Sequence, residues 1–298
     1  MVFVLLSVSF FIGYLIYRAE KGSRLYEFKV LVGFWYQLFT HKIERMEEAR
    51  YRYGKHWRQY FLLVKPKREM TDREHVILYF HGGGWRLGKP EFFRVHAKLF
   101  AERGYHVIMP SHRRIPLYSY QHMREDLNLL MPKIDEVLAQ HGLQDKQIIL
   151  GGASSGANLA AHMLYHRAEL HKQGWSQDRF AGIFLLAAPL DLSKMEQSFV
   201  LESYVGWQKE ASIEAASPIT YLEAVENTPV LCVHGAKDGI VAYDTTCSFV
   251  EKMRTINPDI IQFHTLEGGT HLDVSRWGYR MDELQTVLLE WIERFEVQ

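Results

Sequence analysis

Residues 147–160 read QIILGGASSGANLA, and this stretch does most to define the fold class. It begins with a run of apolar residues, which is typical of a strand buried on both faces. A helix-forming stretch follows it, and between the two lies the G-x-S-x-G sequence of residues 152–156. In this strand–turn–helix setting, such a turn lifts its central serine above the sheet. Ser154 has glycines at both −2 and +2, which allow the sharp turn, whereas Ser155 has not. The sequence therefore predicts Ser154 as a nucleophile.

The rest of the chain alternates short apolar runs with longer amphipathic stretches. The runs predict strands over residues 59–64, 75–80, 106–109, 147–150, 182–187, 230–233 and 260–266. The amphipathic stretches predict helices over residues 92–103, 120–141, 155–172, 243–255 and 281–295. Strands that alternate with helices build a mostly parallel sheet with helices on both faces. We therefore expect an α/β fold with a mostly parallel central sheet.

Three regions follow from this pattern. Residues 1–17 form an apolar segment that resembles a membrane anchor, and residues 18–58 form a helical, aromatic-rich extension. Residues 59–298 form one α/β domain, interrupted at about 193–225 by a charged stretch without a clear strand. We interpret that stretch as a small helical cap inserted between two core strands.

The N-terminal segment contains no charged residue before Arg18. As a helix, residues 1–17 would span roughly 26 Å, slightly less than the hydrocarbon core of a bilayer. Lys21 and Arg24 follow, so the positive-inside rule predicts a membrane-associated chain with its catalytic domain in the cytoplasm. A cleaved signal of a secreted protein and a buried helix of a soluble cytoplasmic protein are the alternatives. The aromatic stretch 30–39 could pack on its own domain, lie in a membrane interface or cover a substrate pocket.

Composition excludes several classes of protein. The 298 residues carry 35 basic and 35 acidic side chains, and this balance argues against a nucleic-acid-binding protein. Cys232 and Cys247 cannot form a disulfide framework and lack the spacing of metal ligands. We expect neither a metal nor an organic cofactor. The sequence gives no indication of the oligomeric state.

A second glycine-rich motif, HGGGW at residues 81–85, follows the predicted strand 75–80. Three consecutive glycines leave backbone N–H groups uncovered, as an acyl-transfer enzyme requires to stabilise an oxyanion. A phosphate-binding loop is the alternative, but no G-K-[ST] follows and the spacing differs from G-x-G-x-x-G.

A serine nucleophile needs a base, and the base needs an orienting acid. His271 follows the last predicted strand, and Asp238 follows the strand before it. The order Ser154, Asp238, His271 is the order expected in an α/β-hydrolase. Asp191 and Asp273 are the alternative acids. We interpret His234, at the end of a predicted strand, as a packing residue rather than the base.

From about residue 59 onward, the chain resembles the esterase/lipase group of α/β-hydrolases, which includes hormone-sensitive-lipase-like and acetyl-esterase enzymes. Four motifs in the same order carry the resemblance: residues 81–85, residues 113–116 with Glu125 and Asp126, residues 152–160, and residues 234–241. The sequence departs from the usual pattern at His112, Ala153 and Ser155, which leaves the shape of the pocket open. No family motif covers residues 1–58.

The resemblance implies a role for each matched residue. Ser154 would be the nucleophile, His271 the general base and then acid, and Asp238 its orienting partner. The oxyanion would be bound by the backbone N–H groups of Gly83, Gly84 and Ser155.

The expected reaction is hydrolysis of small-molecule carboxylic esters with small to medium acyl groups, through an acyl-enzyme. Two alternatives remain. An amidase with arylformamidase-like activity uses a similar loop and triad, and the fold also occurs in non-catalytic binding proteins.

Overall fold

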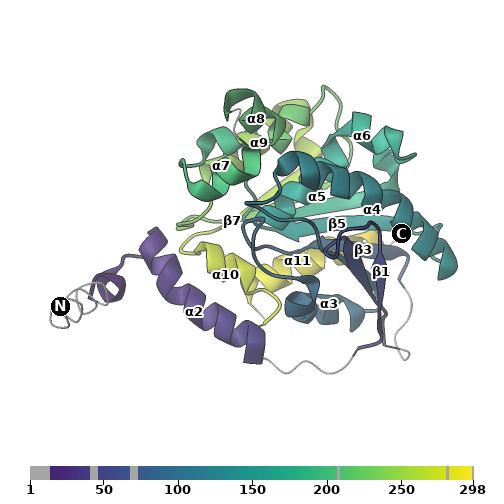
Figure 1. The fold of residues 1–298 in the computed structure, drawn as a ribbon, viewed down its shortest axis with the longest axis horizontal. Helices are drawn as coiled ribbons and strands as arrows, with labels where there is room; N and C mark the ends of the chain where they lie inside the picture. Colours follow the sequence, from purple (N-terminus) through teal and green to yellow (C-terminus); the bar gives the residue numbers. More distant parts are fainter. Residues whose placement is uncertain (1–13, 41–45, 68–72, 207–208, 280–281, 297–298) are drawn as a thin grey trace.

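The computed structural model describes residues 14–40, 46–67, 73–206, 209–279 and 282–296. These residues build one eight-stranded sheet with the order β1-β2-β4-β3-β5-β6-β7-β8 (Figure 1). β2 pairs antiparallel with both β1 and β4, and all other neighbours are parallel. The strands are β1 (Glu48–Arg52), β2 (Tyr60–Val64), β3 (His75–Phe80), β4 (His106–Pro110), β5 (Gln147–Ala153), β6 (Phe180–Leu186), β7 (Val230–Gly235) and β8 (Ile261–Leu266).

The mostly parallel α/β sheet predicted from the sequence is confirmed. The predicted strands correspond to β2 through β8. The apolar runs of β2, β3, β5, β6 and β7 are buried on both faces of the sheet, whereas β8 at the sheet edge is only partly buried.

The strand β1 corrects one expectation, since residues 18–58 were expected to be helical. Three of the five residues in its sequence EARYR are charged, and it carries no apolar run that would predict a strand. It lies at the sheet edge, where it needs only one partner strand and where charged residues are common. The Tyr51 ring packs 5.5 Å from Phe61, and the Arg50 guanidinium lies 3.5 Å above the Tyr60 ring. These cross-strand contacts hold an edge strand that hydropathy alone does not reveal.

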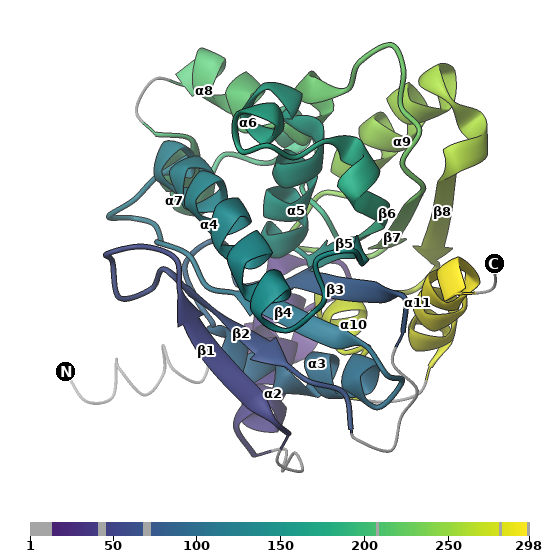
Figure 2. The same ribbon diagram turned by 90° about the vertical axis from the view of Figure 1, so that its right-hand side faces the viewer.

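Helices cover both faces of the sheet (Figure 2). The helices α4, α5, α6 and α9 lie on one face, and α3, α10, α11 and α2 lie on the other. Two buried apolar clusters accordingly sandwich the sheet. The helices are α2 (Arg24–Thr40), α3 (Arg94–Ala101), α4 (Tyr120–Gln140), α5 (Ser155–Tyr165), α6 (Arg167–Lys172), α7 (Phe199–Val205), α8 (Lys209–Ala215), α9 (Asp244–Ile256), α10 (His271–Ser275) and α11 (Glu283–Glu293).

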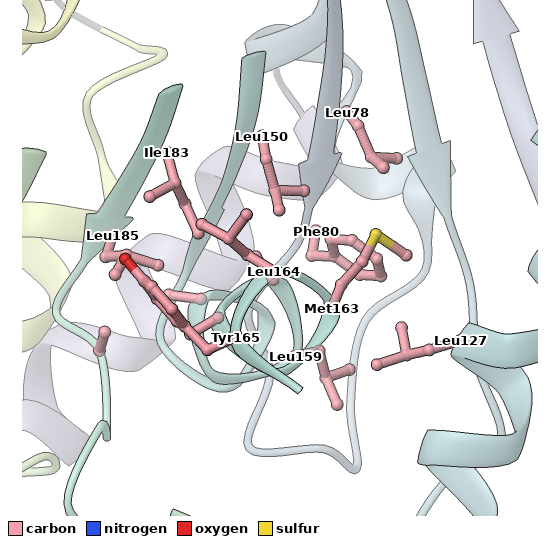
Figure 3. Packing of buried hydrophobic residues seen from close by; sticks show 14 of the residues in the cluster. Leu78, Phe80, Leu127, Leu150, Leu159, Met163, Leu164, Tyr165, Ile183 and Leu185 are labelled. Atoms are coloured by element: carbon pink, nitrogen blue, oxygen red, sulfur yellow. The ribbon is translucent and has the colours of Figure 1, made fainter. Parts of the chain in front are cut away.

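The helix α5 is packed tightly into the first of these clusters (Figure 3). All of its residues are buried, and Met163 and Leu164 project toward side chains of the neighbouring strands. Burial of each large apolar side chain contributes about 1.5–3 kcal/mol. Because α5 begins at Ser155, this packing also fixes the turn that precedes it.

Residues 193–225, expected to form a cap, lie between β6 and β7 in the chain, and every regular element in their described part is helical. These are the end of the 3-10 helix Leu192–Lys194, then α7, α8 and the 3-10 helix Pro218–Tyr221. Figure 1 shows α7 and α8 side by side above the sheet. The division of the chain into the three expected regions stays a prediction.

Most of the expected membrane anchor, residues 1–13, lies outside the described residues, and residues 14–18 are helical. Within the part of the chain that the structure describes, no helix combines the length and the apolar character that crossing a bilayer requires.

Candidate active site

The turn between β5 and α5 holds Ser154 in a backbone conformation that is rare for a residue with a side chain, with φ 53° and ψ −127°. Positions 152 and 156 on either side must be glycine, because a side chain there would clash with backbone atoms. A Cβ on Gly152 would lie 2.6 Å from the nitrogen of Ala157, and one on Gly156 would lie 2.3 Å from the carbonyl oxygen of Phe80. Strain of this kind costs about 1–3 kcal/mol and is typical of functional sites.

The structure brings the three predicted side chains together. The Nε2 atom of His271 lies 2.9 Å from the Ser154 hydroxyl, and its Nδ1 atom lies 2.7 Å from the Asp238 carboxylate. His271 is the first residue of α10, and Asp238 lies in the loop after β7. A hydroxyl, an imidazole and a carboxylate joined by two hydrogen bonds can pass a proton from serine to histidine.

The Asp238 carboxylate has a full set of partners although it is buried. Its Oδ1 atom accepts hydrogen bonds from the N–H groups of Ile240 and Val241, both at 2.8 Å. Its Oδ2 atom lies 3.2 Å from the Nε2 atom of His234, in addition to His271. Burial opposes ionisation, but the adjacent His271 and His234 hold the pKa of Asp238 well below its usual range.

His234 thus has a contact that the sequence analysis did not foresee. The imidazole is fully buried, as a packing residue would be, but it supports the acid directly and its Nδ1 atom lies 2.8 Å from the Thr246 hydroxyl. The four-residue spacing between His234 and Asp238 is a signal that could have indicated this contact.

The pKa of His271 is raised above its ordinary value of 6.5. Burial acts in the opposite direction, but the negative charges of Asp238 and, more weakly, Glu27 favour the protonated ring.

The two alternative acids have other partners. Asp191 accepts from the backbone and hydroxyl of Ser193, and Asp273 caps α10 through Thr270.

The loop after β3 runs beside Ser154. A Cβ on Gly82 would lie 3.3 Å from the Cβ of Ser154, so the loop could not approach so closely with a larger residue. Gly83 has φ +139°, and a Cβ there would lie 2.3 Å from the carbonyl oxygen of Leu87. Gly84 also has positive φ, at +60°.

The three predicted oxyanion donors line the same cavity as Ser154. Among the described residues, no backbone carbonyl accepts a hydrogen bond from the N–H groups of Gly83, Gly84 or Ser155. Ser155 opens α5, so its N–H is one of the helix-terminal amides that have no intrahelical acceptor. These amides are therefore available to a negatively charged oxygen.

The last residue of the glycine motif connects the loop to the cap. The indole of Trp85 stacks on the ring of Tyr204 in α7, with centroids 3.8 Å apart. The Tyr204 hydroxyl donates to the side-chain oxygen of Asn158 at 2.6 Å, and Asn158 belongs to α5. One stack therefore links the glycine loop, the cap and the helix that follows Ser154.

A cavity of about 390 Å³ opens above Ser154. Its polar lining includes Ser154, His271, the glycine loop and the charged residues Arg24, Glu27 and Arg86, whereas most of the remaining wall is apolar. Leu31, Phe34 and Trp35 of α2 form one wall, so the aromatic stretch 30–39 both packs on the domain and covers the pocket. The cap contributes the opposite wall through residues such as Met195 and Val200.

No cluster of three or more His, Cys, Asp or Glu side chains could hold a metal ion in the described ranges of the chain. The expectation that no metal or cofactor is needed stays a prediction.

With this geometry in place, comparison with known proteins identifies the family. The BD-FAE family model matches residues 63–253, which is more than half of the chain. The chain belongs to the BD-FAE family. The matched region includes Ser154, the glycine loop and Asp238, but it begins after α2 and ends before His271.

Curated relatives of this BD-FAE member carry esterase names. A probable isoprenylcysteine alpha-carbonyl methylesterase from Oryza sativa subsp. japonica is 24% identical over 285 residues, which cover 88% of this chain and 66% of the relative. The isoprenylcysteine alpha-carbonyl methylesterase from Arabidopsis thaliana is 20% identical, with 84% and 62% covered. The chain thus spans slightly less than two thirds of the length of these relatives.

Solved structures establish that this BD-FAE member has an α/β-hydrolase fold, which it shares with solved esterases. A truncated carbohydrate esterase from gut microbiota matches with a TM-score of 0.73 at 14% identity, over 85% of this chain and 97% of the other. Inhibited esterase B from Lactobacillus rhamnosis matches with a TM-score of 0.71 at 19% identity, over 91% and 94%.

One residue at the site was missed by sequence reasoning. Glu27 of α2 is 1% exposed, lines the cavity and contacts the backbone of His271. It is the one acidic residue in α2, and a lone carboxylate within an aromatic helix is the signal that could have indicated it. It lies outside the part of the chain that the BD-FAE model matches.

Proposed function

We propose that the chain is a serine hydrolase that cleaves carboxylic esters through an acyl-enzyme formed on Ser154. The observation that carries this proposal is the chain of contacts from the Ser154 hydroxyl to His271 at 2.9 Å and from His271 to Asp238 at 2.7 Å. These contacts lie next to backbone N–H groups that bond to no backbone carbonyl among the described residues, in a largely apolar cavity. The esterase names of the relatives support the same reaction.

The mechanism follows from these positions. The Ser154 oxygen attacks the ester carbonyl carbon while His271 Nε2 takes the hydroxyl proton. Asp238 accepts a hydrogen bond from Nδ1–H and stabilises the imidazolium that forms. The N–H groups of Gly83, Gly84 and Ser155 bind the oxyanion of the tetrahedral intermediate. His271 then gives the proton to the leaving alcohol, and water releases the acid from the acyl-enzyme by the same steps.

The cavity supports an ester with an apolar group of small to medium size. A volume of about 390 Å³ is at the lower end of the range of roughly 300–1,000 Å³ for small-molecule sites. Apart from Arg24 and Glu27, the walls from α2 and the cap are largely apolar, so they favour an acyl or alcohol group without charge. The relatives named for isoprenylcysteine suggest one substrate class that combines a methyl ester with an apolar group.

Hydrolysis of p-nitrophenyl esters from acetyl to dodecanoyl tests the proposal, with Ser154→Ala as the control. We expect kcat/KM to be highest for short and medium chains and to disappear in the variant. Activity on formanilides without activity on esters would favour the amidase alternative. No turnover of either, with Ser154 unreactive toward a fluorophosphonate, would favour a binding protein.

We also propose that the chain is held at a membrane with its catalytic domain on the cytoplasmic side. The uncharged segment 1–17 and the basic residues after it support this. Apolar side chains at the end of this segment and in α2 are also exposed, between 38% and 74%. This N-terminal apolar surface consists of Tyr14, Leu15, Tyr17, Leu25, Phe28, Val32 and Tyr36.

Membrane pelleting of the full chain and of a variant that begins at Lys21 tests the second proposal. We expect the full chain to sediment with membranes and the shortened variant to stay in the supernatant. Sedimentation of both would assign binding to the exposed side chains of α2 instead, and sedimentation of neither would contradict a membrane location. Protease accessibility in sealed vesicles then reports the side.

A further inference from the structure

The carboxylate of Glu27 contacts both of the loops that carry the acid and the base. Its Oε1 atom accepts hydrogen bonds from the N–H of His271 at 2.7 Å and from the N–H of Gly239 at 3.3 Å. Its Oε2 atom lies 3.4 Å from the N–H of Leu272. Gly239 directly follows Asp238, so one side chain from α2 joins the backbone of the acid loop to that of the base loop.

These amides need an acceptor that the rest of the fold does not supply. His271 and Leu272 are the first two residues of α10, and the first N–H groups of a helix have no intrahelical partner. A carboxylate at this end of a helix forms charge-assisted hydrogen bonds, which are stronger than those between neutral groups. Glu27 therefore fixes the backbone from which the His271 ring projects.

The chain before α2 is fitted to the same loop. A Cβ on Gly239 would lie 2.7 Å from the carbonyl carbon and oxygen of Ser23. The absence of a side chain at Gly239 thus lets the backbone of the N-terminal extension lie directly on the acid loop. Figure 1 shows α2 alongside α10, beneath the sheet.

Burying the Glu27 carboxylate costs desolvation free energy, which packing of α2 on the domain does not require. Burial raises the pKa of Glu27, and only the hydrogen bonds from the backbone and the adjacent His271 oppose that effect. An apolar residue would cover the cavity at a lower desolvation cost. The geometry therefore points to a function of the carboxylate at the site itself.

We propose that Glu27 is a positioning residue, which holds His271 and the Asp238 loop in register and whose negative charge strengthens His271 as a base. The proposal rests on the ester hydrolysis proposed above. It makes α2, which lies outside the region matched to the BD-FAE family, a part of the catalytic unit.

Several other charged groups near Glu27 form ion pairs of their own. Asp273 pairs with Lys21 at 3.5 Å, and Arg24 pairs with Glu196 of the cap at 2.7 Å. The titratable and charged groups on the elements packed around Glu27 are His271, Asp238, Asp273, Lys21, Arg24, Lys237 and Arg276.

The experiment compares the full chain with Glu27→Gln, Glu27→Ala and the control Glu20→Gln. Glu20 is an exposed carboxylate in the same extension, so its variant removes a nearby charge without touching the loops. Steady-state kinetics on p-nitrophenyl butyrate are normalised to active sites titrated with a fluorophosphonate. The His271 ring is titrated separately by NMR, which requires no substrate.

We expect kcat of Glu27→Ala to fall about 10- to 100-fold with little change in KM, because small displacements of a catalytic group have effects of that size. Glu27→Gln retains an acceptor but loses the charge. Its His271 titration should therefore move to lower pH by about half a pH unit or more, and the acidic limb of kcat/KM should move with it. Glu20→Gln should behave as the wild type.

Two results would overturn the proposal. In the first, Glu27→Gln has the same His271 titration and the same kcat as the wild type. In the second, a smaller fraction of the Glu27→Ala protein is folded, but kcat per titrated active site equals that of the wild type. If Glu27→Ala does not fold, Glu27→Gln decides alone. If the wild type hydrolyses no ester, the proposed function fails, but the NMR titration still tests the positioning role.

Discussion

The turn around Ser154 and the helix α2 line the same cavity, but they are specified in different ways. The turn is shaped by steric limits close to Ser154, because a Cβ on Gly152 would meet Ala157 and one on Gly156 would meet the carbonyl oxygens of Phe80 and His81 at the end of β3. The contribution of α2 depends on Glu27, whose main partner, His271, is 244 positions away. Short-range steric requirements leave a motif in the sequence, whereas a contact over such a distance leaves a residue of ordinary type.

The largest effect is expected from the turn. Ser154→Ala should reduce kcat by about 10⁴-fold or more without changing the circular dichroism spectrum, because the nucleophile is lost and the fold is not. Ser155→Ala should remain largely active, because only its backbone N–H is needed. A comparable loss of kcat in both variants would contradict the assignment of Ser154 alone as the nucleophile.

The next effect concerns the acid loop, which both regions support. Asp238→Asn should lower kcat by about 10⁴-fold, as expected when the partner that orients a triad histidine is replaced. A loss smaller than about tenfold would mean that another group, such as His234, orients the base.

The pH dependence follows from the same pair. His271 must be neutral to accept a proton, and its pKa is raised, so wild-type kcat/KM should fall as the pH decreases through a value above 6.5. In Asp238→Asn this limb should move to lower pH, because the charge that favours the protonated ring is gone. A profile that stays in place would contradict the assignment of the limb to His271.

Gly83→Ala tests the glycine loop, which like the turn is limited by space. We expect kcat to fall by about 10²- to 10³-fold, because a Cβ 2.3 Å from Leu87 oxygen must displace a loop that carries an oxyanion donor. Gly174→Ala is the matched control, since Gly174 also has positive φ (+76°) but nothing within 4 Å of its Cβ position. That control should lose only about 1 kcal/mol of stability. An active Gly83→Ala enzyme would remove the loop from the mechanism.

The smallest effect is expected on the α2 wall of the cavity. Leu31→Ala removes part of an apolar lining, so KM for p-nitrophenyl hexanoate should rise about 3- to 10-fold with kcat nearly constant. Lys29→Ala, an exposed position on the same helix, should change neither constant. If Leu31→Ala has the same KM as the wild type for the hexanoyl ester as well as for the acetyl ester, α2 does not contact the acyl chain.

The sequence was informative where the required side chains or their absence follow from local geometry. The strands β2 to β8 were predicted from buried apolar runs, and Ser154, Asp238 and His271 from their places at strand ends. The edge strand β1 was missed because one partner strand suffices for its charged sequence. Glu27 was missed because neither periodicity nor spacing relates a helix near the N-terminus to a loop near the C-terminus.

The stack of Trp85 on Tyr204, together with the hydrogen bond from Tyr204 to Asn158, has a consequence for engineering. Because the cap lines the cavity, exchanging it is one way to change which substrates fit. In this protein, a transplanted cap without an aromatic residue at the position of Tyr204 would leave the indole next to the glycine loop unsupported and an amide of α5 without its partner. A successful graft therefore has to carry over this aromatic contact, or redesign Trp85 and Asn158 together with the cap.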